Sequence, residues 1–330
     1  MIDQSSSSTE LPAPIVVAVD GSATSHHAVA WAAVEAALYQ RRLHILTSAA
    51  IPTGFAPAID FDREEFFRLR NLGQRILTEA IRIARLAEPS EDLDICTEVT
   101  LEPIIAELLT RSTHAHMLVL GSRGLGAIRC GLLGSVSTAA VHHAHCPVVV
   151  VYSASATDTI SASKPVLVGV DGTPNSLPAL AIVFGFGFGF DEASRRKVEL
   201  IALHAWSDTR RSDLPVLNWD GIRETEHASL AESLAGWSEQ HPDVPVHRIV
   251  VCDHPARALL HEADNALLVV VGSHGRGGFT GMLLGSTSNA LLHSVQCPII
   301  IARHPRHTRS RGFPGDHQAP ASVEPYSAST

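Results

Sequence analysis

The stretch GSRGLGAIRCGLLGS, residues 121–135, returns later in the chain as GSHGRGGFTGMLLGS, residues 272–286. The second copy begins 151 residues after the first (272 − 121 = 151), and both copies have the spacing Gly-x2-Gly-x9-Gly-Ser. A segment this rich in glycine is not a packing element, because glycine has no side chain to bury and adopts backbone conformations that other residues avoid. The repetition therefore predicts a functional loop that the chain builds twice.

The same offset relates other parts of the chain. PIVVAVDGSATS (14–25) returns as PVLVGVDGTPNS (165–176), and HCPVVVV (145–151) returns as QCPIIIA (296–302). Three matches at one offset predict a duplicated domain. We expect domain 1 over residues 13–152 and domain 2 over 164–304, joined by a small polar linker at 153–163. Residues 1–12 and 305–330 are expected to be disordered.

Within each copy, short apolar runs alternate with helical patterns. IVVAV and VLVGV are β-branched runs that end in Asp-Gly, as is typical of buried strands. The alternation predicts an α/β fold with a parallel sheet and helices on both faces. FGFGFGF (184–190) has no counterpart in the first copy. It predicts an insertion of roughly four or five residues with a distorted or extended helix end, because glycine disfavours helix interiors; an apolar patch for a partner is the alternative.

Composition narrows the class of protein. The chain has 330 residues, of which 45% are apolar and 18% charged, with a net charge of −9 and a pI near 6.1. The acidic balance argues against a general nucleic-acid binder. The N-terminus has no signal-peptide pattern and no apolar run could span a bilayer, so we expect a cytoplasmic protein without a membrane partner. Five cysteines without CxxC spacing argue against a disulfide framework or a zinc site.

The glycine loop has the features of an anion site. It follows an apolar strand and ends at Ser135 or Ser286, where a helix is expected to begin. Consecutive amides in such a loop, together with a helix N-terminus, favour phosphate oxygens. Asp20 and Asp171 end the first strand of each copy on the same side of the sheet and could accept from a base or ribose, or help to hold Mg²⁺. The chain has neither GxxxxGK[ST] nor GxGxxG after its first strand, so a P-loop and a dinucleotide fingerprint are excluded; a loop without a ligand is the remaining alternative.

The loop spacing, the early VDGS and VDGT, and the closing CPVVVV and CPIIIA resemble the universal stress protein family in its tandem form, over about residues 14–304. The resemblance implies two Rossmann-like domains of the adenine nucleotide alpha hydrolase-like group, each with five strands in the order 3-2-1-4-5. It also implies ATP with Mg²⁺ as cofactor. The implied contacts in copy one are Asp20, Ala49, Gly121, Arg123, Gly124, Gly134, Ser135 and Val136, and those in copy two are Asp171, Ala205, Gly272, Gly275, Gly285, Ser286 and Thr287.

Two sequence differences, one between the copies and one from the family's pattern, affect the implied site. His274 stands where copy one has Arg123, and Thr280 stands where it has Arg129, so copy one is expected to bind more tightly if those arginines touch phosphate. Leu101 and Asp253 stand where the family has a glycine ahead of the third helix.

The resulting interpretation is a stress-linked regulator that responds to ATP through conformation or partner binding, as a homodimer or with a regulatory protein. A slow ATPase and a nucleotide-free scaffold are the alternatives. No general base is apparent beside the phosphates, so no catalytic residue is predicted. The last strands of the two copies are predicted edges for pairing, between copies or between chains. Weaker hypotheses are a metal at the histidines of 114–116 and 142–146, a redox role for Cys130, and docking through the basic segment 303–311.

Overall fold

The computed structural model describes residues 12–50, 63–124, 133–152, 163–170, 188–206, 219–273 and 284–303. The termini that we expected to be disordered and nearly all of the predicted linker lie outside these ranges, as do Cys130 and most of the basic segment.

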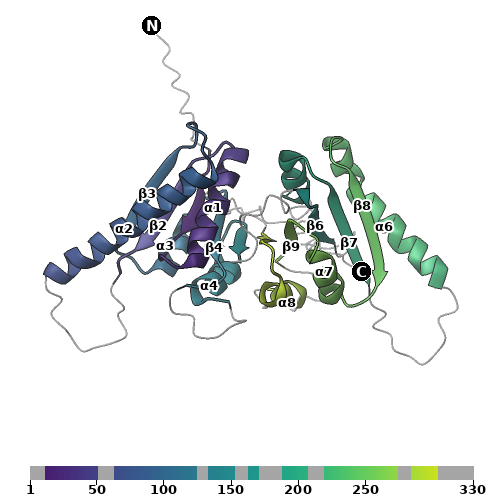
Figure 1. Cartoon of the computed structure of the whole chain (residues 1–330). Coiled ribbons are helices and arrows are strands. Elements are labelled where there is room, and N and C mark those ends of the chain that lie inside the picture. The colour runs from purple at the N-terminus through teal and green to yellow at the C-terminus, as the bar shows by residue number, and fades with distance from the viewer. Residues whose placement is uncertain are drawn as a thin grey trace, which may run out of the picture.

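Strands and helices alternate throughout the described chain, as the sequence predicts (Figure 1). The first half contains β1 (Ile15–Ala18), α1 (Ala23–Leu38), β2 (Leu43–Ser48), α2 (Arg63–Ala87), β3 (Ile95–Thr100), α3 (Ile104–Arg111), β4 (Met117–Gly121), α4 (Ser135–His143) and β5 (Val148–Val151). The second half contains β6 (Val166–Val170), β7 (Leu200–Trp206), α6 (Trp219–Gln240), β8 (Val246–Cys252), α7 (Pro255–Ala263), β9 (Leu268–Gly272), α8 (Ser286–Ser294) and β10 (Ile299–Ala302). Residues 188–196 are helical as well.

All strands in the described ranges belong to one ten-stranded sheet with the order β3-β2-β1-β4-β5-β10-β9-β6-β7-β8. Neighbouring strands within each half are parallel, and the halves join where β5 and β10 pair antiparallel. Val149 faces Ile300, its own counterpart at the 151-residue offset. The two halves are thus related by an approximate two-fold axis at this joint, and the last strands pair between copies rather than between chains.

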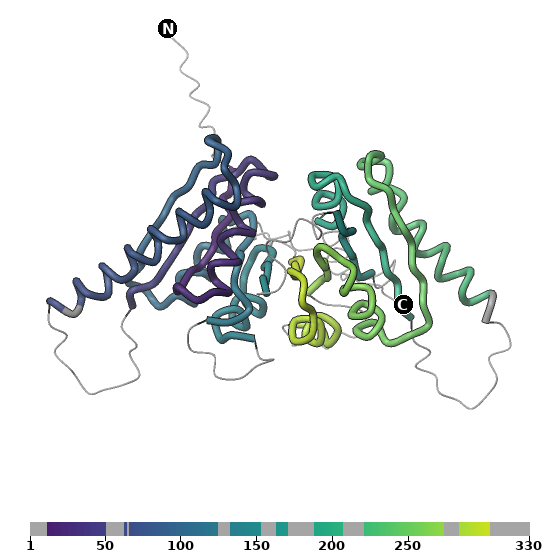
Figure 2. Tube along the Cα trace, in the orientation of Figure 1, coloured from purple at the N-terminus to yellow at the C-terminus, as the bar shows by residue number. Residues whose placement is uncertain are grey.

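The helices form a layer on each face of the sheet. Successive residues of a strand point to opposite faces, so Ile15 and Val17 enter one core while Val16 enters the other. The first core lies under α1, α2, α6 and residues 188–196, and the second lies under α3, α4, α7 and α8. Helices α2 and α6 lie on opposite flanks of the molecule, blue and light green in Figure 2. Each core continues across the joint, which makes the two halves one packed body.

The described part of the glycine–phenylalanine insertion is an ordinary helix. Phe190 is fully buried, and its ring lies 6.3 Å from that of Trp237 and 5.6 Å from that of His241. Strand registers place the insertion at six residues, because Leu43 follows its β1 partner Ile15 by 28 positions and Leu200 follows Val166 by 34. Our expectation of four or five was too small. Residues 184–187 lie outside the described ranges.

Candidate functional site

The predicted loop residues of the first half gather at the carboxyl ends of β1 and β4. The Asp20 carboxylate accepts a hydrogen bond from the Ser22 N–H at 2.9 Å, and Ser22 caps the N-terminus of α1. A Cβ atom on Gly124 would lie 2.5 Å from Asp20 Oδ2. The loop backbone therefore runs directly against the acid, at a distance that only glycine allows.

The far end of the loop is held to the strand by two hydrogen bonds. The Gly134 N–H donates to the Ser122 carbonyl at 2.8 Å, and the Ser137 hydroxyl donates to the Gly121 carbonyl at 2.7 Å. Gly134 is the N-cap of α4 and provides no side-chain cap, so Ser135 and Val136 begin the helix with amides that no cap engages. Such an N-terminus is suited to an anion.

The second half repeats this arrangement where it is described. The Gly285 N–H donates to the Ser273 carbonyl at 2.8 Å, and the Ser288 hydroxyl donates to the Gly272 carbonyl at 2.7 Å. Gly285 caps α8 without a side-chain bond, and Ser286 and Thr287 begin that helix. Asp171 and Gly275 lie outside the described residues. The described ends of the two loops share one geometry, which is what two sites of one kind would require.

Arg123 contributes its backbone to the loop. Its carbonyl accepts a hydrogen bond from the Thr24 hydroxyl and lies 3.5 Å from the Ser22 hydroxyl. These contacts tie the loop to the N-terminus of α1. Burial raises the pKa of the Tyr152 hydroxyl, and the charge of Arg123 opposes that rise in part.

Ser122 is a site residue that the sequence argument missed. It is 2% exposed, and its hydroxyl has no hydrogen-bond partner among the described residues. An unpaired buried hydroxyl is costly unless something else engages it. Its signal was visible in the repeat, since a serine follows the first loop glycine in both copies.

The two alanines predicted near adenine lie at the carboxyl ends of β2 and β7 but at positions that differ by one residue. The strand registers match Ala49 with Trp206, and Ala205 with Ser48. The Ala49 N–H already donates to the Thr100 carbonyl at 2.8 Å, which leaves its carbonyl for a ligand.

A buried histidine distinguishes the second half at this edge. His204 Nδ1 lies 3.0 Å from the Val170 carbonyl and Nε2 lies 2.8 Å from Glu226 Oε2. A carbonyl only accepts, so the Nδ1 of His204 is the donor in the contact with Val170. The first half has Thr47 at the matching position. The sequence could not reveal this pair, because 22 residues separate its members.

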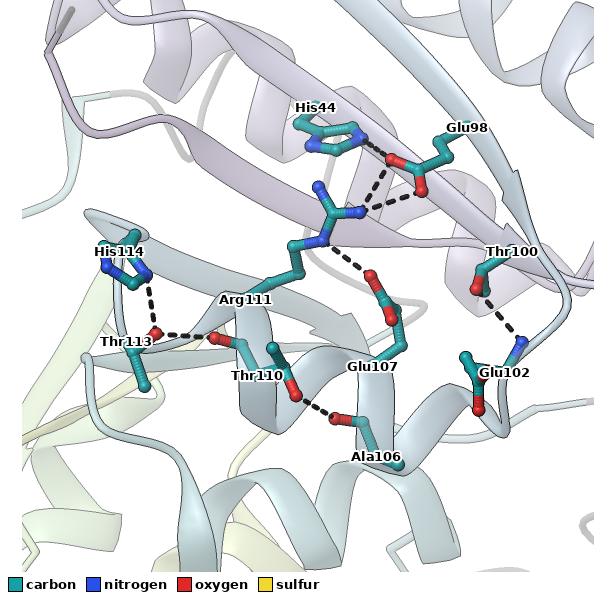
Figure 3. A network of polar contacts seen from close by, with 10 residues as sticks. All are labelled: His44, Glu98, Thr100, Glu102, Ala106, Glu107, Thr110, Arg111, Thr113 and His114. Atoms are coloured by element: carbon teal, nitrogen blue, oxygen red, sulfur yellow. Dashed lines mark hydrogen bonds and ion pairs between the residues drawn. The ribbon is translucent and has the colours of Figure 1, made fainter.

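A network of charged side chains lies on the first half (Figure 3). Arg111 binds Glu98 at 2.8 Å and Glu107 at 2.6 Å, and His44 Nε2 lies 3.2 Å from Glu98. Burial lowers the pKa of His44. The network joins α3 to β2 and β3, and we assign it a structural role because it does not reach the loop.

The hollow lined by Pro14, Arg42 and Asp94, about 720 Å³ in volume, opens at the amino ends of β1, β2 and β3. Ligands of open parallel sheets bind at the carboxyl ends instead. We therefore place the site at the glycine loops and not in this hollow.

The other hypotheses gain no support from the described ranges. No group of three or more histidine, cysteine, aspartate or glutamate side chains there could hold a metal ion. Cys96, Cys146, Cys252 and Cys297 are free thiols. Burial raises the pKa of Cys146 to about 12, which leaves its thiol unreactive at neutral pH.

The sheet, its covering helices and the duplicated glycine loops define a tandem α/β protein with Rossmann-like halves. The family model for the universal stress protein family matches residues 13–152 and 162–303. The chain belongs to this family.

The chain is similar to the following known proteins. A universal stress protein of Mycobacterium tuberculosis is 44% identical over 290 residues, covering 88% of this chain and 96% of its own. The crystal structure of a universal stress protein from Archaeoglobus fulgidus covers 88% of this chain and 98% of its own, with a TM-score of 0.63 and 18% identity, a likeness of fold. A universal stress protein solved in complex with cAMP covers 43% of this chain and 98% of its own, at 28% identity and a TM-score of 0.34. None of the described helices is both long and apolar enough to span a bilayer.

Proposed function

We propose that each half of this chain binds an adenine nucleotide, ATP with Mg²⁺, and that occupancy regulates conformation or partner binding in a stress response. The observation that carries the proposal is the loop geometry: glycine backbone against Asp20, followed by the uncapped start of α4. Amides at Ser135 and Val136 would hold phosphate, and the unpaired Ser122 hydroxyl would donate to it. The second loop would act in the same way through Ser286 and Thr287.

The remaining predicted contacts fit the same ligand. Asp20 would accept from the ribose or contact Mg²⁺ carried by the phosphates. Ala49 and Ala205 would offer backbone atoms to adenine at the ends of the second strands. Arg123 would strengthen the first site relative to the second, which has His274 there.

In this proposal, nucleotide occupancy has a regulatory effect, and the protein acts in the cytoplasm. The edges β5 and β10 are already paired within the chain. A homodimer of whole chains would therefore use another surface, such as the outermost strands β3 and β8.

The direct test is to denature protein purified without added nucleotide, and to identify and count what it releases. ATP at one or two per chain is the expected result, and titration with ATP and Mg²⁺ should give the same number of sites. Release of AMP or ADP alone would favour the ATPase alternative. No released nucleotide and no binding on titration would contradict the proposal and leave the scaffold.

Gly124→Ala should weaken binding at the first site. Its new methyl group would lie 2.5 Å from Asp20 Oδ2, so either the loop or the Asp20 carboxylate must move. We expect affinity at that site to fall about tenfold or more, equal to roughly 1.4 kcal/mol or more. Calorimetric titration would show one site of lower affinity. Gly236→Ala is the matched control, because a Cβ there meets nothing within 4 Å; equal losses in both variants would contradict the assignment.

A further inference from the structure

At the joint between the halves, corresponding positions of the two halves make matching contacts across it, but the residue types at these positions differ. Helix α1 and helix 188–196 end at matching left-handed residues, Gln40 (φ 50°) and Lys197 (φ 56°). The offset here is 157 residues (197 − 40 = 157), which makes Glu35 the counterpart of Glu192 and Tyr39 the counterpart of Arg196. Each half thus presents the same acid but a different partner for it.

These four side chains meet on the two-fold axis. The Tyr39 hydroxyl donates to Glu192 Oε1 at 3.0 Å, and reciprocally Arg196 donates to Glu35 Oε2. Arg196 also binds Glu192 Oε2 at 3.0 Å within its own helix. Both glutamate side chains are fully buried. One guanidinium therefore serves two buried carboxylates.

The opposite face of the sheet repeats the pattern independently. The Tyr152 hydroxyl donates to the Leu292 carbonyl at 2.6 Å, and Arg303 donates to the Val141 carbonyl. Both the donors and the acceptors correspond at the 151-residue offset. On both faces the first half uses tyrosine and the second half uses arginine at the same structural position.

The charge balance depends on this difference. Glu35 Oε1 has no hydrogen-bond partner among the described residues, whereas both oxygens of Glu192 are engaged. Burial, the largest cause, raises the pKa of Glu35 well above its ordinary value, against the opposing effect of Arg196. Without Arg196, neither buried acid would have an arginine bonded to it, and Arg195 on the Tyr39 ring would be the cation left nearby.

We propose that the joint is selective: the first half is built to pair with the second half and to reject another first half. Two first halves would bring together two glutamates and two tyrosines, with no arginine among these four side chains. Further asymmetry supports this selection, because Arg195 stacks 4.2 Å above the Tyr39 ring and donates to the Leu38 carbonyl at 2.8 Å. The counterpart of Arg195 in the first half is Leu38, which provides neither contact. The inference concerns pairing and does not rest on the proposed nucleotide binding.

Arg196→Tyr tests the inference in the intact chain, because it gives the second half the residue of the first. We expect the thermal unfolding midpoint, followed by circular dichroism, to fall by about 5–10 °C, because removing Arg196 leaves buried carboxyl groups without their partner. Arg82→Tyr is the matched control. Arg82 lies on α2 in an exposed pair with Glu79 and its side chain is 59% exposed, so we expect a shift of about 1 °C or less.

Neutralising the acids separates charge from packing. Adding Glu35→Gln and Glu192→Gln to Arg196→Tyr should restore most of the fall in the thermal midpoint. The two glutamine substitutions alone should lower the midpoint, because they leave Arg196 buried without an acidic partner. An unchanged midpoint in Arg196→Tyr, or no recovery in the triple variant, would overturn the proposal. If Arg196→Tyr does not fold, the triple variant is compared with the double glutamine variant, which differs from it only at position 196. With both acids neutral, the proposal requires that arginine at this position gives a thermal midpoint no higher than tyrosine does.

Discussion

Gly121→Ala is expected to lower the free energy of unfolding by about 3 kcal/mol, the upper part of the range for overpacking a tight core. A Cβ on Gly121 would lie 2.8 Å from the Thr24 carbonyl carbon and 2.9 Å from the Ser25 nitrogen. These are backbone atoms in the first turn of α1, which cannot turn away as a side chain can. The strand end and the helix must separate, and the loop between them moves as well.

Urea unfolding of Gly121→Ala and Gly236→Ala measures the change in the free energy of unfolding that each substitution causes. Gly236 lies inside α6 with nothing within 4 Å of its added Cβ. Alanine there should stabilise the chain by up to about 1 kcal/mol through helix propensity. The same substitution thus has opposite signs at the two positions. A loss of less than about 1 kcal/mol for Gly121→Ala would contradict the close approach of β4 and α1.

His116→Leu is expected to remove a large part of the chain's sensitivity to acid. His116 packs 4.7 Å from the Tyr39 ring and 5.8 Å from the Phe188 ring, across the joint. Burial first, and then Arg41 and Arg195, lower the pKa of His116 to about 4. Leu267 stands at the matching position of the second half, so the fold accepts leucine there.

The direction of the effect follows from proton uptake. As pH falls below the ordinary histidine pKa of about 6.5, the unfolded chain binds a proton at this position and the folded chain does not. Folding stability contributed by neutral His116 is therefore lost between about pH 6.5 and pH 4, up to about 3 kcal/mol. The leucine variant lacks this loss.

Urea unfolding of both proteins between about pH 7.5 and pH 4.5 measures the difference. The stability of His116→Leu relative to the parent should rise steadily as pH falls. Glu35, whose raised pKa acts in the opposite direction, is present in both proteins and cancels. Parallel stability curves would show that His116 does not titrate as its burial requires.

Much of the fold was predictable because the sequence contains the same domain pattern twice. The repeat at one offset predicted two halves, and the alternation of apolar runs with helical patterns predicted parallel strands, both of which the structure has. The length of the insertion was misjudged, since sequence matching could not place its boundary among repeated Phe-Gly pairs. Strand register decided it.

The candidate site was predicted in part. Local spacing indicated Gly121, Gly124 and Gly134, and the structure brings all three to the end of β1 and β4. Ser122 escaped notice because a serine beside glycine has many ordinary roles. His204 and Glu226 escaped because their contact joins a strand to a helix, and no local pattern records it.

The sequence by itself determined the duplication, the alternating elements and the positions of the loops, because these depend on short-range periodicity and on glycine's backbone freedom. Only the tertiary structure decided that β5 pairs with β10 within one chain. Only the tertiary structure brought Glu35, Glu192 and a single arginine to one axis. Burial and charge balance depend on what residues far apart in the chain place around each side chain, and that is a property of the folded molecule.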